Sequence, residues 1–131
     1  MILLDTHIII WDALAPNRLS PRAQQAIAQA NKQDGMLLAD ISLWEIAMLI
    51  QKGRLQIGTD CHSFLMLLLQ ANQLRVVPIS AQIAAQAVQL PVLVNQDPAD
   101  RLIVATALAE QAVLITADHN LQTSGIVPIL W

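Results

Sequence analysis

Charged residues and cysteine are scarce in this chain of 131 residues. Charged side chains make up 13% of it, against about 25% in an average protein. The single cysteine, Cys61, excludes an internal disulfide and any Cys-x-x-Cys metal or redox motif. The apolar run from Phe64 to Leu69 is far shorter than the roughly 20 residues that cross a bilayer, so we expect no membrane association.

The N-terminus lacks the features of a signal peptide. Met1 to Leu4 lead directly into Asp5, with no basic region before them and no long apolar segment. We therefore expect the protein to stay in the cytoplasm. No repeat, linker or low-complexity stretch divides the sequence, and its length suits one domain over residues 1–131.

Basic residues are also few. The net charge is −3 and the pI is near 5.4, which argues against a general nucleic-acid binder with a basic surface. A nuclease is still compatible with this charge, because metal ions at an acidic site can neutralise substrate phosphates. The composition is 55% hydrophobic with a mean hydropathy of +0.50, so we expect exposed apolar surface and an oligomer or a dedicated partner.

Short, uniformly apolar runs alternate with helical patterns along the chain. The runs that predict strands covered on both faces are residues 2–4, 36–39, 76–79, 113–116 and 127–130. The patterns that predict helices are residues 6–14, 21–31, 43–52, 62–72, 81–90 and 98–111. This alternation predicts an α/β fold with βαβ units and a mainly parallel sheet, whose ligands bind beyond the carboxyl ends of the strands.

Four acidic residues stand next to these apolar segments: Asp5, Glu45, Asp100 and Asp118. A buried carboxylate is costly unless it is paired, hydrogen-bonded or bound to a metal, and the chain has few cations to pair with. Strand carboxyl ends and helix N-termini share one edge of a doubly wound sheet, so the four acids are expected to converge. Oxygen ligands without a histidine or cysteine cluster favour Mg²⁺ or Mn²⁺ over zinc.

Local helix chemistry offers an alternative explanation for each acid. Asp5 is placed to cap the helix that follows it, and Asp118 could belong to a plain turn. Ser42 and Glu45 have the spacing of a capping box, in which Ser42 is the N-cap and Glu45 returns a hydrogen bond. Helix capping therefore remains an alternative at these positions.

The segment Asp97-Pro98-Ala99-Asp100-Arg101 has the same ambiguity. Asp97 is a natural N-cap, Pro98 a natural first helical residue, and Asp100 falls in the first turn, where the helix dipole favours negative charge. We interpret Asp97 mainly as structural. For Arg101 we expect an ion pair with a neighbouring acid rather than a substrate contact.

The order and spacing of four motifs resemble the PIN-domain ribonucleases, and within them the VapC-like toxins of type II toxin–antitoxin systems. The motifs are Leu-Leu-Asp-Thr-His from residue 3, Ser-Leu-Trp-Glu-Ile-Ala from 42, Asp-Pro-Ala-Asp-Arg from 97 and Leu-Ile-Thr-Ala-Asp from 114. The resemblance maps the metal-site acids of the family onto Asp5, Glu45, Asp100 and Asp118, with Thr116 as a supporting hydroxyl. One departure is Asn95, where relatives often carry a histidine.

The resemblance implies a three-layer α/β/α domain with a central five-stranded parallel sheet flanked by helices. It also implies an endoribonuclease that cleaves structured RNA, with Asp5, Asp100 and Asp118 holding Mg²⁺ or Mn²⁺ and Glu45 completing the site. The ion would lower the pKa of a water molecule and orient it for in-line attack on phosphorus. A cognate antitoxin would inhibit the enzyme, and the domain would form a homodimer. The helix around Phe64 to Leu69 is too apolar for one buried face and is a candidate surface for either partner.

Other classes fit the residues less well. A haloacid-dehalogenase phosphatase needs a second acid two residues after the first, where this chain has His7. A receiver domain needs a lysine near the C-terminal strands, whereas the only lysines are Lys32 and Lys52. The remaining alternative is a non-catalytic PIN scaffold that binds RNA or a protein partner while its acids only cap helices.

Overall fold

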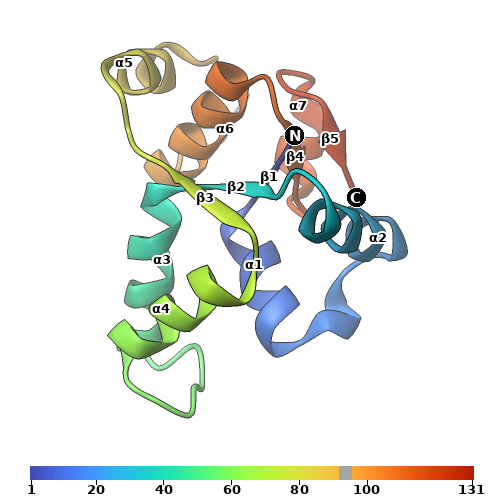
Figure 1. Ribbon diagram of the computed structural model, residues 1–131. Coiled ribbons are helices and arrows are strands. Elements are labelled where there is room, and N and C mark those ends of the chain that lie inside the picture. Colours follow the sequence, from blue (N-terminus) through green and yellow to red (C-terminus); the bar gives the residue numbers. More distant parts are fainter. Residues whose placement is uncertain (92–95) are drawn as a thin grey trace.

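A parallel β-sheet lies between two layers of helices in the computed structural model, which describes residues 1–91 and 96–131 (Figure 1). Over these residues the sheet has five strands in the order β3-β2-β1-β4-β5, and every neighbouring pair is parallel. The strands are β1 (Ile2–Leu4), β2 (Met36–Ala39), β3 (Leu74–Val77), β4 (Val113–Ile115) and β5 (Ile129–Leu130). The predicted α/β/α architecture is confirmed.

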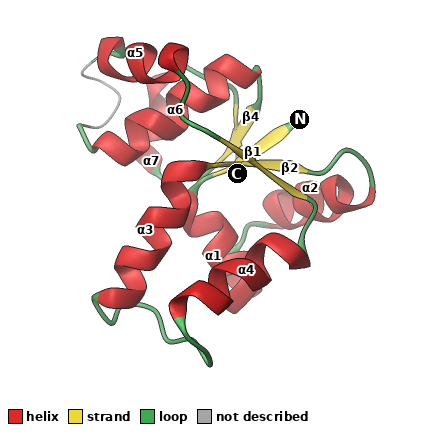
Figure 2. Ribbon diagram, turned by 60° about the vertical axis from the view of Figure 1, so that its left-hand side comes forward, coloured by secondary structure: helices red, strands yellow, loops and turns green. Residues whose placement is uncertain are grey.

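The helices divide between the two faces of the sheet. On one face the core packs against α1 (Thr6–Leu14), α2 (Pro21–Lys32), α3 (Asp40–Gln51) and α4 (Cys61–Ala71), with the 3₁₀ helix η1 (Pro16–Arg18) after α1. On the other face it packs against α5 (Ala81–Gln89), α6 (Pro98–Glu110) and α7 (His119–Ser124). Figure 2 shows α5 and α6 on the opposite side of the strands from α1 and α4.

Strand register explains why the strands are apolar throughout. Leu3 pairs with Leu37 and Leu114 on neighbouring strands, and all three contribute to the core under α5 and α6. The next residues along each strand point the opposite way, into the core under α1 to α4: Leu4, Leu38 and Ile115. Each of the six side chains is at most 1% exposed, so both faces of the three central strands are buried.

The structure differs from the sequence-based prediction at several boundaries. Strand β3 begins earlier than predicted, at Leu74, and includes the exposed Arg75, because an edge strand needs an apolar face only toward the core. Strand β5 has only two residues. The helix η1 and the six-residue α7 were not predicted, because short capped helices have the same residue types as turns.

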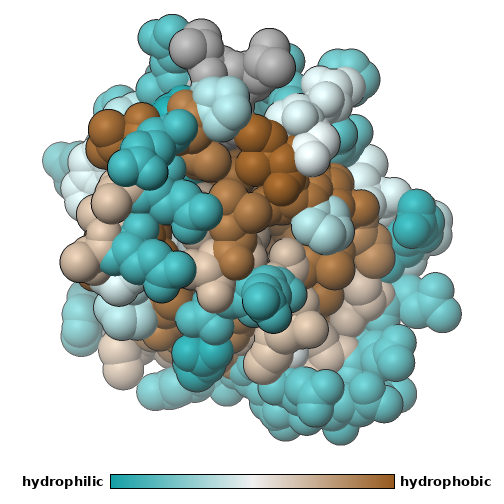
Figure 3. Space-filling view, turned by 90° about the horizontal axis from the view of Figure 1, so that it is seen from above, coloured by the Kyte–Doolittle hydropathy of each residue, from teal (hydrophilic) through white to brown (hydrophobic). Residues whose placement is uncertain are grey.

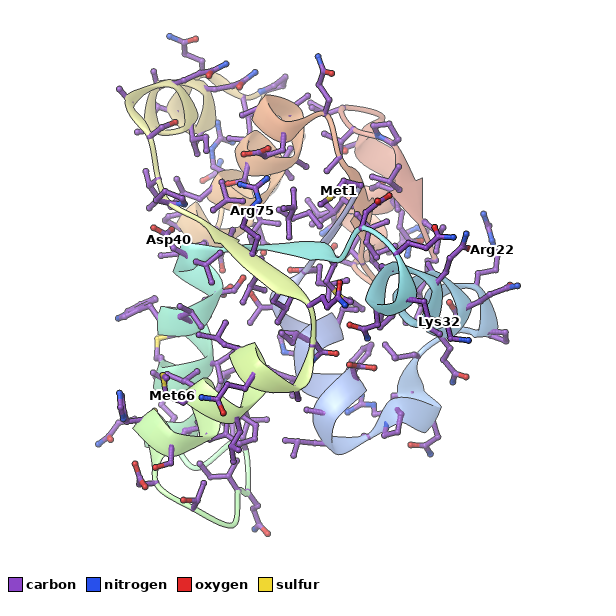
Figure 4. The ribbon with its side chains drawn as sticks, viewed as in Figure 1. Met1, Arg22, Lys32, Asp40, Met66 and Arg75 are labelled. Carbon is purple, nitrogen blue, oxygen red and sulfur yellow. The ribbon has the colours of Figure 1, made fainter. Side chains whose placement is uncertain are left out.

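The start of α3 corrects the capping-box prediction. This helix begins at Asp40 and its N-cap is Ala39, with no side-chain cap, so Ser42 lies inside the helix. Asp40 instead joins the start of α3 to the segment after β3, because its Oδ2 accepts a 3.0 Å hydrogen bond from the backbone N–H of Ile79. Figure 4 shows Asp40 at the junction of β2 and α3.

No helix within the described part of the chain is long and apolar enough to cross a membrane. The carboxyl ends of β1, β2 and β4 lead directly into α1, α3 and the turn before α7. The sheet therefore has one edge at which strand ends and helix N-termini meet, and the sequence-predicted acids lie along it.

Candidate active site

All four predicted acids line one cavity at the carboxyl edge of the sheet. The cavity has a volume of about 320 Å³ and is lined by Asp5, Thr6, His7, Trp11, Glu45, Asp97, Asp100, Ala117 and Asp118. Four helices supply these residues: the first two turns of α1, the second turn of α3, and the N-terminal ends of α6 and α7 with the residues just before them. The convergence expected from the topology is therefore present.

Asp5 is the most deeply buried of the acids, with 8% of its surface exposed. It caps α1 as predicted, since its Oδ1 accepts a 2.8 Å hydrogen bond from the backbone N–H of Thr6. Its Oδ2 accepts a 2.7 Å hydrogen bond from the hydroxyl of Thr116. Burial raises the pKa of Asp5, and the hydrogen bonds from Thr116 and Thr6 oppose that rise without cancelling it.

Thr116 joins two of the acids. Its side chain is fully buried at the end of β4, and its hydroxyl oxygen also accepts a 3.0 Å hydrogen bond from the backbone N–H of Asp118. Asp118 in turn caps α7, accepting from the N–H groups of Asn120 and Leu121. Asp118 is thus a helix cap rather than part of a plain turn, and Thr116 fixes its backbone relative to Asp5.

Glu45 reaches the cavity from α3 and is held by Thr6. The Thr6 hydroxyl donates to Oε1 of Glu45 and lies 2.9 Å from the hydroxyl of Ser42. Because the Thr6 hydroxyl has a single proton, Ser42 is the donor in the contact between the two hydroxyls. Burial raises the pKa of Glu45, the hydrogen bond from Thr6 opposes this, and Asp5 contributes a further rise by charge repulsion.

The pKa of Asp100 is raised well above the ordinary value of an aspartate. Partial burial raises its pKa to about 7, with further contributions from the negative charges of Asp5, Asp97, Asp118 and Glu45. Repulsion from four separate acids requires all of them to lie close to the Asp100 carboxyl group. The raised pKa of Asp100 therefore reflects the concentration of negative charge in the cavity.

Asp97 both caps α6 and lines the acidic cavity. It caps α6 as predicted, since its Oδ1 accepts hydrogen bonds from the backbone N–H groups of Ala99 (2.8 Å) and Asp100 (3.4 Å). It also lines the cavity and contributes to the raised pKa of Asp100. The nearby Asn95 lies outside the described residues.

The guanidinium of Arg101 contacts backbone carbonyl groups rather than an acid among the described residues. The described partners of its guanidinium are backbone carbonyl oxygens at the end of α5, not carboxylates: those of Ala87 (2.9 Å), Val88 (3.3 Å), Leu90 and Pro91 (3.3 Å). A helix end leaves its last carbonyl groups without partners, and the planar guanidinium can satisfy several of them at once. Within the described part of the chain, the ion-pair prediction for Arg101 is therefore replaced by a contact that joins α6 to the end of α5.

Sequence reasoning did not recognise Thr6 as a site residue. Its side chain is buried beside Asp5 and hydrogen-bonds Glu45, which lies 39 positions away. Its position as the first residue of α1, directly after the cap Asp5, gave no local sign of this contact. Trp11 packs against the core under α1 to α4 and also lines the acidic cavity.

The donor set suits a hard divalent cation, since it consists of carboxylate and hydroxyl oxygens. Among the described residues, no group of three or more Asp, Glu, His and Cys side chains is arranged to hold a metal ion as it stands. Binding an ion would therefore require the carboxylates to turn toward a common point. The carboxylates repel one another, which contributes to the raised pKa of Asp100. Turning them toward a common point would increase this repulsion unless a cation were bound there.

Comparison with known proteins identifies the family. A PIN domain family model matches residues 2–124. Ribonuclease VapC22 of Mycobacterium tuberculosis is 41% identical over 122 residues, which are 93% of this chain and 90% of that protein. The chain therefore belongs to the PIN-domain family, and the curated relative that it resembles is a VapC ribonuclease.

Solved structures share the fold. VapBC2 from Rickettsia felis, bound to a DNA fragment from its promoter, gives a TM-score of 0.73 at 20% identity, covering 99% of this chain and 98% of that one. The M. tuberculosis toxin VapC20, which cleaves the sarcin-ricin loop, gives 0.65 at 18% identity, with 97% of each chain covered. A toxin–antitoxin complex from Klebsiella pneumoniae gives 0.68 at 20% identity, covering 100% of this chain and 97% of that one.

Proposed function

We propose that this protein is a metal-dependent endoribonuclease toxin that cleaves structured RNA and is inhibited by a cognate antitoxin. The observation that supports the proposal most strongly is the pKa of Asp100, which burial and four neighbouring acids raise to about 7. Carboxylates this closely grouped repel one another and oppose folding. A bound divalent cation would offset that repulsion, and oxygen ligands of this kind suit such an ion. The 41% identity to a ribonuclease supports the same activity.

Asp5, Asp100 and Asp118 would hold one or two Mg²⁺ or Mn²⁺ ions, with Glu45 completing the site. A bound ion would act as a Lewis acid. It would lower the pKa of a water molecule, so that the water could attack the scissile phosphodiester in line at neutral pH. Thr116 and Thr6 hold the carboxylates of Asp5 and Glu45 through their hydroxyl groups. Such support keeps carboxylate ligands oriented and is often needed for full metal affinity.

The substrate would be an RNA with accessible unpaired bases. Proteins recognise RNA sequence mainly in loops, bulges and ends, where the bases are free to stack on side chains. The relative VapC20 cleaves the sarcin-ricin loop, which supports a structured RNA as the class of substrate. The phosphodiester would enter the cavity lined by Asp5, Glu45, Asp100 and Asp118.

The partners would be an antitoxin and a second copy of the chain. Apolar areas on α4 and between α5 and α6 are candidates for them among the described residues. On α4, Met66 and Leu67 are 43% and 57% exposed, in the segment that the sequence singled out. Between α5 and α6, a groove of about 400 Å³ is lined mostly by apolar residues, among them Ile79, Val88 and Leu102. Figure 3 shows apolar residues gathered on the side of the molecule where α5 and α6 lie.

We assign the homodimer to the α5–α6 groove and the antitoxin to α4, because Val88, which lines the groove, is the most exposed of the large apolar residues described, at 82%. Light scattering of the isolated protein tests the first assignment. Val88→Glu should convert a dimer to a monomer, whereas Leu67→Glu should leave the dimer intact. A dimer that survives Val88→Glu but not Leu67→Glu would reverse the two assignments.

Cleavage of a panel of labelled structured RNAs tests the proposed activity. Purified protein is compared with Mn²⁺, with EDTA and as the Asp100→Asn variant. The matched control is Asp34→Asn, which removes one exposed carboxylate just before β2, at the amino edge of the sheet. We expect cuts with Mn²⁺ for wild type and Asp34→Asn, and none with EDTA or for Asp100→Asn. Identical background in every lane, with folded protein, would count against a nuclease.

A non-catalytic scaffold is the second candidate, because Asp5, Asp97 and Asp118 each have a complete capping role without any metal. Calorimetric titration with Mn²⁺ separates the two. The nuclease proposal predicts binding and a higher melting temperature in millimolar Mn²⁺. Absence of both effects would favour the scaffold.

A further inference from the structure

A second cavity opens beside the acidic one and shares part of its wall. Its volume is about 470 Å³, and it is lined by residues of α1, η1, α3 and the segment after α3. We call it the arginine groove, after Arg18 and Arg54, which line it together with Leu14 and Leu55. His7 and Trp11 line both the arginine groove and the acidic cavity, so the two spaces adjoin.

The arginine groove concentrates positive charge in a chain that has little of it. The sequence has five arginines and a net charge of −3, and two of the five line this groove. Both Arg18 and Arg54 are exposed. Arg75 instead pairs with Glu110 at 3.3 Å, and Arg101 bonds carbonyl oxygens of α5. Two exposed cations therefore line a groove that adjoins the acidic cavity.

Flat side chains accompany these cations. The Arg18 guanidinium lies over the Trp11 ring, 4.5 Å from its centroid. The Trp11 ring is also 6.1 Å, centroid to centroid, from the rings of both His7 and Trp131. Unpaired RNA bases stack on aromatic rings and on guanidinium planes, and such stacking tolerates any base.

We propose that the arginine groove binds the single-stranded RNA that flanks the scissile phosphodiester. Arg18 and Arg54 contact its phosphates, and one base stacks against the Trp11–Arg18 pair. This inference rests on the proposed nuclease function and extends it to a substrate track. The physical reason is charge. Carboxylates repel the phosphates on either side of the one being cut, so the adjoining chain needs a cationic surface to follow. The groove volume lies in the range that accommodates a small ligand such as a nucleotide.

RNA binding in a non-cleaving background tests the proposal. Every protein carries Asp100→Asn, and its affinity for a fluorescein-labelled single-stranded RNA of mixed sequence is measured by anisotropy over a range of salt concentrations. The variants are Arg18→Ala, Arg18→Lys and Arg54→Ala. The matched control is Arg22→Ala, an equally exposed arginine on α2 that does not line the groove and that Figure 4 shows pointing away from the body of the molecule.

We expect Arg18→Ala and Arg54→Ala each to weaken RNA binding about tenfold and to lower the salt dependence by about 0.7 per lost phosphate contact. Arg18→Lys should keep the salt dependence but lose affinity, because lysine keeps the positive charge but lacks the planar guanidinium that stacks on a base. Arg22→Ala should change neither quantity. Calorimetric Mn²⁺ affinity, measured with Asp100 intact, should be the same for all the arginine variants.

Two outcomes would overturn the proposal while leaving the nuclease intact. One is RNA cleavage by the wild-type protein with Mn²⁺, together with equal losses of RNA affinity for Arg22→Ala and Arg18→Ala. Such losses would mean a general effect of charge. The other is RNA affinity and salt dependence that stay at the Asp100→Asn level in both Arg18→Ala and Arg54→Ala, which would mean that the groove does not contact RNA. Failure of the proposed function is a separate result, in which wild-type protein neither cleaves RNA nor binds Mn²⁺.

Discussion

The hydroxyl of Thr116 donates a 2.7 Å hydrogen bond to Oδ2 of Asp5, although the two residues are 111 positions apart. The bond joins the ends of β4 and β1, which are neighbours in the sheet. Both side chains are buried, so no water can readily replace either partner. The orientation of the most buried acid in the cavity therefore depends on a residue at the other end of the chain.

Replacing Thr116 by valine should destabilise the protein and impair the site. The change leaves Oδ2 of Asp5 without its donor at almost the same side-chain volume, at a cost of about 2 kcal/mol. We expect a lower melting temperature and weaker Mn²⁺ binding by calorimetry, with Thr116→Ser restoring most of both. The control is Thr106→Val, a buried threonine of α6 that bonds the carbonyl of Leu102 outside the cavity. Equal effects of both valine variants on Mn²⁺ binding would contradict this role.

Thr6→Val should reduce RNA cleavage more than it reduces stability. It removes the donor to Glu45 and the partner of Ser42, so the Glu45 carboxylate is free to turn away from the cavity. We expect at least a tenfold loss in cleavage rate, because misplacing a reacting or ligating group by a small distance is costly. Thr6→Ser should retain activity. A Thr6→Val variant with wild-type cleavage would show that Glu45 needs no support.

The stability of the metal-free protein should fall as the pH rises from about 4 to 7. The pKa of Asp100 is about 7 in the folded protein against 3.8 for an ordinary aspartate. Below pH 4 the group is protonated in both states and costs nothing. Between these values it is charged when unfolded but still protonated when folded, so each rise in pH favours unfolding. Above pH 7 the cost is fully present and constant.

Thermal melts of wild type and Asp100→Asn across this pH range test the effect, because other titrating groups cancel in the difference. The Asp100 side chain is partly exposed, so solvent screening reduces its contribution, and we expect Asp100→Asn to gain about 1 kcal/mol, or ~4 °C, at pH 8. The gain should vanish near pH 4. Saturating Mn²⁺ should reverse the order at pH 8, since wild type alone gains a full set of ligands. A pH-independent difference would contradict the assignment.

Arg101→Ala should lower stability by about 2 kcal/mol, because carbonyl groups at the end of α5 lose a charged donor. Arg101→Lys should recover little, since an ammonium group cannot reach the same set of carbonyls. Chemical denaturation with Arg75→Ala as the control tests this. Arg75 forms an exposed ion pair with Glu110, so its loss should cost less than about 0.5 kcal/mol. Similar losses for Arg101→Ala and Arg75→Ala would argue against the contact that joins α6 to the end of α5.

Local sequence was sufficient for the features that depend on neighbouring residues. The strands Ile2–Leu4 and Met36–Ala39 and the helix Thr6–Leu14 have the predicted bounds. The caps Asp5 and Asp97 were predicted correctly as well, because an acid followed by a helical pattern bonds the nearest N–H groups whatever the fold. The alternation of strands and helices likewise predicted the parallel sheet and the edge at which its acids lie.

Contacts between distant segments were not predictable in the same way. The sequence placed Ser42 at a helix N-terminus and Arg101 in an ion pair, since both assignments use only adjacent residues. In the folded protein Ser42 bonds Thr6, and Arg101 bonds carbonyl groups ten or more positions away. Thr6 and Trp11 carried no local signal of their place in the cavity.

The sequence by itself determined the architecture, the identity of the four acids and the edge of the sheet on which they lie, because periodicity, capping and strand order are local or topological. Only the tertiary structure decided which hydroxyl holds each carboxylate, how far the pKa of Asp100 rises, and that two arginines border the acidic cavity. Those properties depend on distances of a few ångströms between segments, and packing sets such distances only when the whole chain is folded.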